Sequence, residues 1–257
     1  MDLPFILVVI ARMPAGRCWM VMVLLGVGLH ISNPLSAQTT QSVDPSRFQN
    51  WTEFQVYHLL NRRWELYYDV GIRYQLPIFK DWFRIHVRPS IQYNGIPWIK
   101  FNGGFGFFYT FSDPDLFEFR PWQGVRFPLL RKRRIKLAAK IRIEERFTIA
   151  SNDHWQFAFR SRYQLGATIP INKEFMEKGT LYGVPSMEAF QGNRNVEEVF
   201  ADRWRFDIGL GYILDWPVRV EVHYIFQNSF NNTTDSFNGD AHILRVRFTY
   251  RVKYDNY

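Results

Sequence analysis

The chain has 257 residues, of which 47% are hydrophobic and 18% aromatic, a length and composition that a single β-barrel domain can account for. Its formal net charge is +8, and Cys18 is its only cysteine, which excludes an internal disulfide. After residue 37 no apolar run reaches the 18 residues that a membrane-spanning helix needs.

Residues 1–37 have the features of a secretory signal peptide. The apolar stretch Trp19–Ile31 follows two arginines and precedes a small-residue site that ends at Ala37. We therefore expect export, with cleavage between Ala37 and Gln38. The mature chain, residues 38–257, would then contain no thiol for catalysis.

The charge of the mature chain indicates its partners. The signal carries one net positive charge, which leaves +7 on residues 38–257. Basic chains bind nucleic acid or anionic lipid, and an exported protein rarely meets nucleic acid. We expect the lipid bilayer as partner, together with anionic lipid headgroups or small anionic solutes, and no nucleic acid.

From residue 48 onward the sequence alternates between apolar and polar residues, the period of a strand with one apolar face. In residues 63–75 the even positions are all apolar or aromatic. Many alternating segments reach about ten residues, the length of a tilted membrane strand. In chain order, the predicted strands are Phe48–Leu59, Arg63–Gln75, Trp82–Tyr93, Ile99–Phe111, Leu116–Phe127, Ile135–Phe147, Trp155–Ile169, Thr180–Gln191, Arg203–Leu214, Val218–Gln227 and His242–Lys253.

These segments number eleven, whereas bacterial single-chain barrels generally have an even number of strands. We therefore expect an all-β fold, a single antiparallel up-and-down transmembrane β-barrel of ten or twelve strands, with twelve preferred. Turn signals such as Asn94-Gly95 and Ser112–Asp115 separate the strands. No linker divides residues 38–257, which form one predicted barrel domain.

Alternation alone does not separate a membrane barrel from a soluble one. Arginines and lysines recur on the polar face, and glycines such as Gly71 and Gly209 lie among them, as in a crowded interior. Aromatic residues such as Trp64, Tyr93 and Trp155 lie near strand ends, as in the aromatic girdles of lipid-facing barrels. We expect a bacterial outer-membrane barrel, with a soluble periplasmic ligand-binding barrel as the alternative.

Several short motifs resemble a family of outer-membrane barrels catalogued as domain of unknown function 2490. The resemblance runs from about Trp51 to the C-terminus and implies this fold and location, but no established activity. Lys140 stands where the family strand suggests His, and His223 where it suggests Gly. The motifs are Ala139–Phe147, Arg160–Tyr163, Tyr182 with Glu188–Phe190, Asp202–Phe206, Gly209–Tyr212, and Val220–Tyr224 with Gln227.

The sequence contains no catalytic constellation, so we expect no enzyme, although a lipid-modifying enzyme of the outer membrane stays an alternative. His86 and Ser90 share a strand face but lie about 13 Å apart at strand rise, too far for direct proton transfer. The mature histidines are scattered, so we expect neither a metal nor another cofactor. The glycines of Phe101–Phe107 lie in a strand and indicate close packing.

A basic ladder on the polar face is the candidate site. The ladder either fills the lumen as a salt-bridged network or lines a narrow anion-favouring passage, and both interpretations stay open. Its members are Arg142, Arg146, Arg160, Arg162, Arg205, Arg245, Arg247 and Arg251, with Glu118, Glu144, Asp207 and Glu221 as acidic partners in the same space.

Overall fold

The computed structural model describes residues 46–76, 82–132, 134–151, 155–192, 203–215, 218–231, 236–237 and 240–252. The predicted signal peptide, its cleavage site and the predicted start of the barrel domain at residue 38 lie outside these ranges. In the described part of the chain, no helix has the length and apolarity required to cross a membrane.

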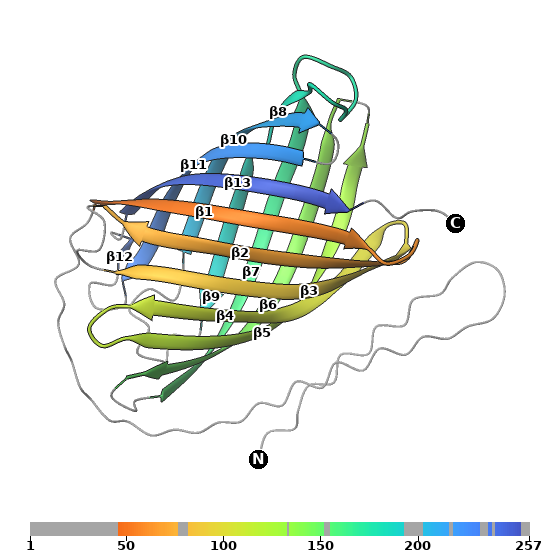
Figure 1. Cartoon of the computed structure of the whole chain (residues 1–257). Coiled ribbons are helices and arrows are strands. Elements are labelled where there is room, and N and C mark those ends of the chain that lie inside the picture. Colours follow the sequence, from red (N-terminus) through yellow and green to blue (C-terminus); the bar gives the residue numbers. More distant parts are fainter. Residues whose placement is uncertain are drawn as a thin grey trace, which may run out of the picture. The chain divides into compact units, whose positions relative to one another are not determined.

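The described residues form an all-β barrel, as the alternation predicts (Figure 1). The strands are β1 Ser46–Leu59, β2 Trp64–Gln75, β3 Phe83–Ile96, β4 Ile99–Phe111, β5 Leu116–Arg131, β6 Lys136–Ala150, β7 Trp155–Pro170, β8 Leu181–Gly183, β9 Ser186–Gly192, β10 Arg203–Asp215, β11 Val218–Asn231, β12 Ser236–Phe237 and β13 Asp240–Val252.

Thirteen labelled strands occupy eleven positions around the described barrel. The short strands β8 and β9 share one position, because both pair with β7 on one side and with β10 on the other. The two-residue β12 pairs with β11 alone. The remaining strands follow one another as an antiparallel meander, which brings β11 beside β13.

The barrel closes between its first and last strands, and this closing pair is parallel. Ser46 of β1 lies opposite Asp240 of β13, and the pairing continues to His58 and Val252. A meander with an odd number of positions brings its first and last strands together in the same direction. The expectation of ten or twelve strands, all antiparallel, is therefore wrong, and the eleven alternating segments correspond to the eleven positions.

The side chains on the two faces of the barrel differ sharply in polarity. Among the described residues, outward positions carry exposed apolar groups such as Ile208 and Leu210, which are 69% and 56% exposed. Inward positions carry buried charged groups such as Glu53 and Glu144. Glu145 on β6 is an exception, as a carboxylate on the outward face. The protein thus inverts the usual arrangement of an apolar core and a polar surface.

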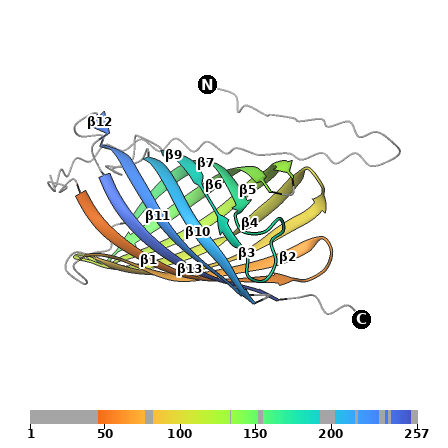
Figure 2. The ribbon, with the colours of Figure 1, turned by 90° about the horizontal axis from the view of Figure 1, so that it is seen from above.

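Aromatic rings gather toward the ends of neighbouring strands on the outward face. Trp64 and Tyr93 have ring centroids 4.8 Å apart at the end that carries the β1–β2 turn. At the opposite end, Phe83 lies 5.7 Å from Phe111. Figure 2 shows the strands of the near and far sides crossing obliquely, as the strand tilt of a closed barrel requires.

Inward-facing glycines give room to large side chains on the neighbouring strands. A Cβ on Gly209 would lie 2.4 Å from Nδ1 of His223, its direct cross-strand partner. A Cβ on Gly71 would lie 2.7 Å from Cε1 of His86, again directly opposite. The crowded interior predicted from these glycines is present.

Candidate functional site

All eight arginines of the basic ladder lie close to carboxylates in the lumen. Arg146 is 2.6 Å from Glu118, and Arg160 and Arg162 are 2.6 and 2.7 Å from Glu144. The other pairs are Arg142 with Glu144, Arg205 with Glu188, Arg245 with Asp207, Arg247 with Glu53 and Glu221, and Arg251 with Glu65.

Glu144 is the centre of one ion-pair network. Its carboxylate is 1% exposed and lies within 4 Å of four guanidinium groups from β5, β6 and β7. Arg162 also contacts Glu188 at 2.7 Å, and Arg120 also contacts Glu118 at 2.6 Å. These shared arginines connect β5 to β9. Charges taken out of water are tolerated when they are paired and hydrogen-bonded in this way.

A second network covers the part of the barrel around the closing pair. Glu53 of β1 contacts Arg73 and Arg247 at 3.1 Å each, and Arg88 bridges from Glu53 to Asp69. Arg247 also contacts Glu221, at 3.2 Å. The Arg247–Glu53 pair therefore joins the last strand to the first across the parallel seam.

Inward aromatic residues stack against arginines of the lumen. The Arg142 guanidinium carbon lies 3.8 Å from the ring centroid of Trp122, and that of Arg120 lies 4.2 Å from Phe108. Trp51 and Phe190 receive further guanidinium groups. Such stacking lets a guanidinium group keep its edge for carboxylates while its face covers a ring.

These aromatic residues and several network members were not predicted from the sequence. The acidic residues Glu53, Asp69 and Glu188 and the basic residues Arg73 and Arg120 are absent from the predicted set. Their positions on the polar face of alternating segments could have identified them. Trp51, Phe108, Trp122 and Phe190 interrupt that alternation, and the interruption is the signal for rings inside the lumen.

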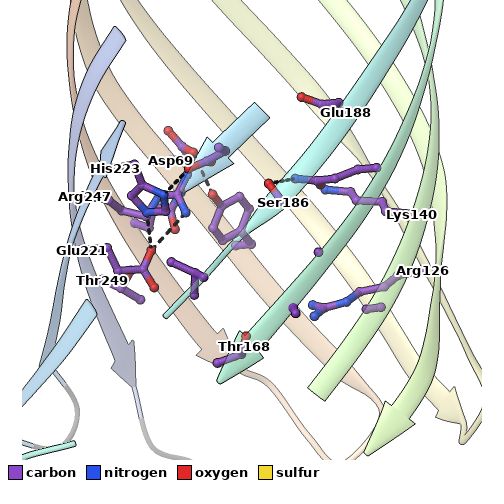
Figure 3. Close-up of a pocket in the computed structure, with 18 of the residues that line it drawn as sticks. Asp69, Arg126, Lys140, Thr168, Ser186, Glu188, Glu221, His223, Arg247 and Thr249 are labelled. Atoms are coloured by element: carbon purple, nitrogen blue, oxygen red, sulfur yellow. Dashed lines mark hydrogen bonds and ion pairs between the residues drawn. The ribbon is translucent and has the colours of Figure 1, made fainter. Parts of the chain in front are cut away.

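One half of the lumen contains a cavity of about 800 Å³ (Figure 3). Its lining reaches the β5–β6 turn at one end of the barrel and stops at the two ion-pair networks. Among the described residues, the lining includes fifteen Lys or Arg residues and six Asp or Glu residues. The cavity is therefore strongly positive even after its carboxylates are paired.

The other half of the lumen, toward the β4–β5 turn, is occupied by side chains. Phe108, Glu118, Arg120, Arg160 and Phe190 are all buried there or at its boundary with the cavity. Rings and ion pairs thus fill the space into which the cavity would otherwise continue.

Two of the described histidines, His86 and His223, contact carboxylates of these networks. His86 is buried, with Nε2 3.0 Å from Asp69, while Ser90 donates a hydrogen bond to the Tyr67 carbonyl oxygen. His223 contacts Asp207 through Nδ1 and Glu221 through Nε2. Within the described ranges, no group of three or more His, Cys, Asp or Glu side chains is arranged to hold a metal ion.

The fold and the lumen define a closed β-barrel with a charged interior and an apolar exterior. Residues 48–238 match the family described as "Protein of unknown function (DUF2490)", and the chain belongs to this family. No curated protein and no solved structure matches the chain. The resemblance inferred from the strand motifs is confirmed, and the family description assigns no activity.

Proposed function

We propose that the protein is an integral β-barrel of the bacterial outer membrane. The observation that carries this proposal is the inversion of polarity, with exposed apolar side chains outside and buried charges inside. A soluble ligand-binding barrel turns its apolar face inward, so this inversion favours the membrane over the soluble alternative. Barrel closure satisfies the backbone groups of all strands, which the hydrocarbon region of a bilayer demands.

We propose further that the lumen is a blocked scaffold with a basic cavity, rather than a wide pore. The ion-pair networks and the buried rings occupy one half, and the cavity in the other half carries excess positive charge. An electropositive cavity raises the local concentration of anions. In this role the cavity binds an anionic solute or a lipid headgroup that enters from one side of the membrane.

Ile208→Arg tests the membrane location. Ile208 lies on the outward face near the middle of β10, and an arginine at the bilayer midplane costs about 2–4 kcal/mol. We expect the variant to be poorly retained in membranes after an alkaline carbonate wash, whereas the wild type stays.

Leu214→Arg is the matched control, since Leu214 is also exposed but lies one residue from the end of β10. Near the membrane interface the same substitution costs about 0–1 kcal/mol, so this variant should be retained. Release of the wild type by the wash, with no difference between the two variants, would refute the membrane location.

A further inference from the structure

Three cations lie side by side across three neighbouring strands on the cavity side of the barrel. The pairing register puts Lys100 of β4 directly opposite Arg126 of β5, and Arg126 directly opposite Lys140 of β6. All three line the cavity, and Figure 3 shows Arg126 and Lys140 projecting into it. We call Lys100, Arg126 and Lys140 the cation row.

The cation row differs from the basic ladder in its partners. Each ladder arginine lies close to a carboxylate, whereas in the described part of the chain none of the three row residues has one within 4 Å. The nearest acidic position along the row is Glu188, two strands beyond Lys140, and it is held by Arg162 and Arg205. Glu65 also lines the cavity, but it pairs with Arg251.

Such a row is unfavourable without a counterion. Directly opposite side chains in an antiparallel pair have Cβ atoms about 4.5–5.5 Å apart, and like charges there are destabilising. Arg126 has a like charge on both sides. The ion-pair networks neutralise the neighbouring arginines but leave these three cations without carboxylates. This difference implies that a negative group from outside the chain completes the site.

We propose that the cation row binds a phosphate group or another group with two or more negative charges. Arg126 offers planar paired donors, and the flanking lysines add point charges about one strand spacing away on each side. The turn cations Arg131, Lys132 and Lys136 also line the cavity and increase the attraction for anions. This site deepens the proposed function, because it gives the basic cavity a ligand class.

Neutral polar side chains elsewhere in the cavity lining suit the rest of such a ligand. Ser186, Thr168 and Thr249 offer neutral hydroxyl groups toward the same space, as Figure 3 shows. The ion-paired residues Glu221 and Arg247 lie across from the row. A cavity of about 800 Å³ accommodates a molecule considerably larger than phosphate itself.

Calorimetric titration of the refolded full chain with inorganic pyrophosphate in non-ionic detergent tests the site. We expect saturable binding to the wild type, about tenfold weaker binding or worse for Arg126→Gln, and a smaller loss for Arg126→Lys, which keeps the charge but not the planar donors. Arg63→Gln is the matched control, because it removes the same charge from the exposed β1–β2 turn at the same end of the barrel, outside the cavity lining.

Unfolding midpoints separate this effect from misfolding. Without added anion, Arg126→Gln should unfold at a higher urea concentration than the wild type, since two like-charge contacts are relieved. Pyrophosphate should raise the midpoint of the wild type more than that of the variant at the same concentration. Absence of saturable binding, or equal affinity in the Lys100→Gln, Arg126→Gln, Lys140→Gln triple variant, would overturn the proposal.

A lipid competitor identifies the source of the phosphate. Displacement of pyrophosphate by phosphatidic acid in mixed micelles would assign the site to a lipid headgroup, whereas retention would assign it to a free solute. Because binding is measured in detergent, its failure is separate from a failure of the membrane location tested with Ile208→Arg.

Discussion

Glu144 takes part in more ion pairs than any arginine of the predicted basic ladder does. Its carboxylate lies within 4 Å of four arginines from three strands, of which three belong to the ladder and Arg120 does not. Because arginines outnumber carboxylates in the lumen, Glu53, Glu118, Glu144 and Glu188 each contact two or more arginines. The loss of a carboxylate therefore leaves several cations uncompensated at once, whereas the loss of an arginine removes only one.

Glu144→Gln should destabilise the barrel by roughly 3–5 kcal/mol, the usual cost when one partner of a buried ion pair is removed. The measurement is urea unfolding of the refolded protein in detergent, followed by tryptophan fluorescence. Glu145→Gln is the control, because it removes the same charge one residue away, on the outward face of β6. Equal effects of the two substitutions would contradict the network.

Among the strands, alternation predicted the positions and the antiparallel pairing of neighbours well, but not the direction of the closing pair. The segments expected at Trp155–Ile169 and Arg203–Leu214 match β7 and β10 within one residue at each end. The segment expected at Thr180–Gln191 is interrupted at Val184 and Pro185, where a proline cannot donate to the sheet. Whether the closing pair is parallel depends on whether the number of positions is odd or even, and the expectation of an even number, typical of bacterial barrels, overruled the eleven alternating segments.

The candidate site was predictable only in part, because alternation identifies the polar face of a strand but not the partners of its side chains on other strands. Alternation assigns Arg142 or Arg245 to the polar face, but partners such as Glu53 and Arg247 are 194 residues apart in sequence. The cation row depends on register across three strands, and register is set by turns and bulges rather than by composition. Lys100, Arg126 and Lys140 were therefore absent from the predicted site.

At the level of strand packing, Gly209→Ala should destabilise the barrel by about 1–3 kcal/mol, the typical cost of overpacking. The added methyl group would meet the imidazole ring of His223 on β11. Gly183→Ala is the control, since a Cβ there meets nothing within 4 Å. Urea midpoints of the two variants give the measurement, and a larger loss for Gly183→Ala would contradict the packing.

For the whole molecule, the proposed membrane location makes permeability a test of the filled half of the lumen. Wild-type protein in planar lipid bilayers should carry no steady current of porin size. The double variant Phe108→Ala, Phe190→Ala, which removes two buried rings from the blocked region, should conduct. A steady anion-selective current through the wild type would instead support a narrow anion-favouring passage, the other interpretation of the basic ladder.

The parallel pair of β1 and β13 also has a consequence for where the first and the last strand of the barrel have their free ends. β1 begins at the end of the barrel opposite to the one at which β13 finishes. In a barrel with an even number of strands, both chain ends leave on the same side of the membrane. In the proposed membrane, Ser46 at the start of β1 and Val252 at the end of β13 would instead lie at opposite faces of the bilayer, so the strands of the barrel begin on one side and finish on the other.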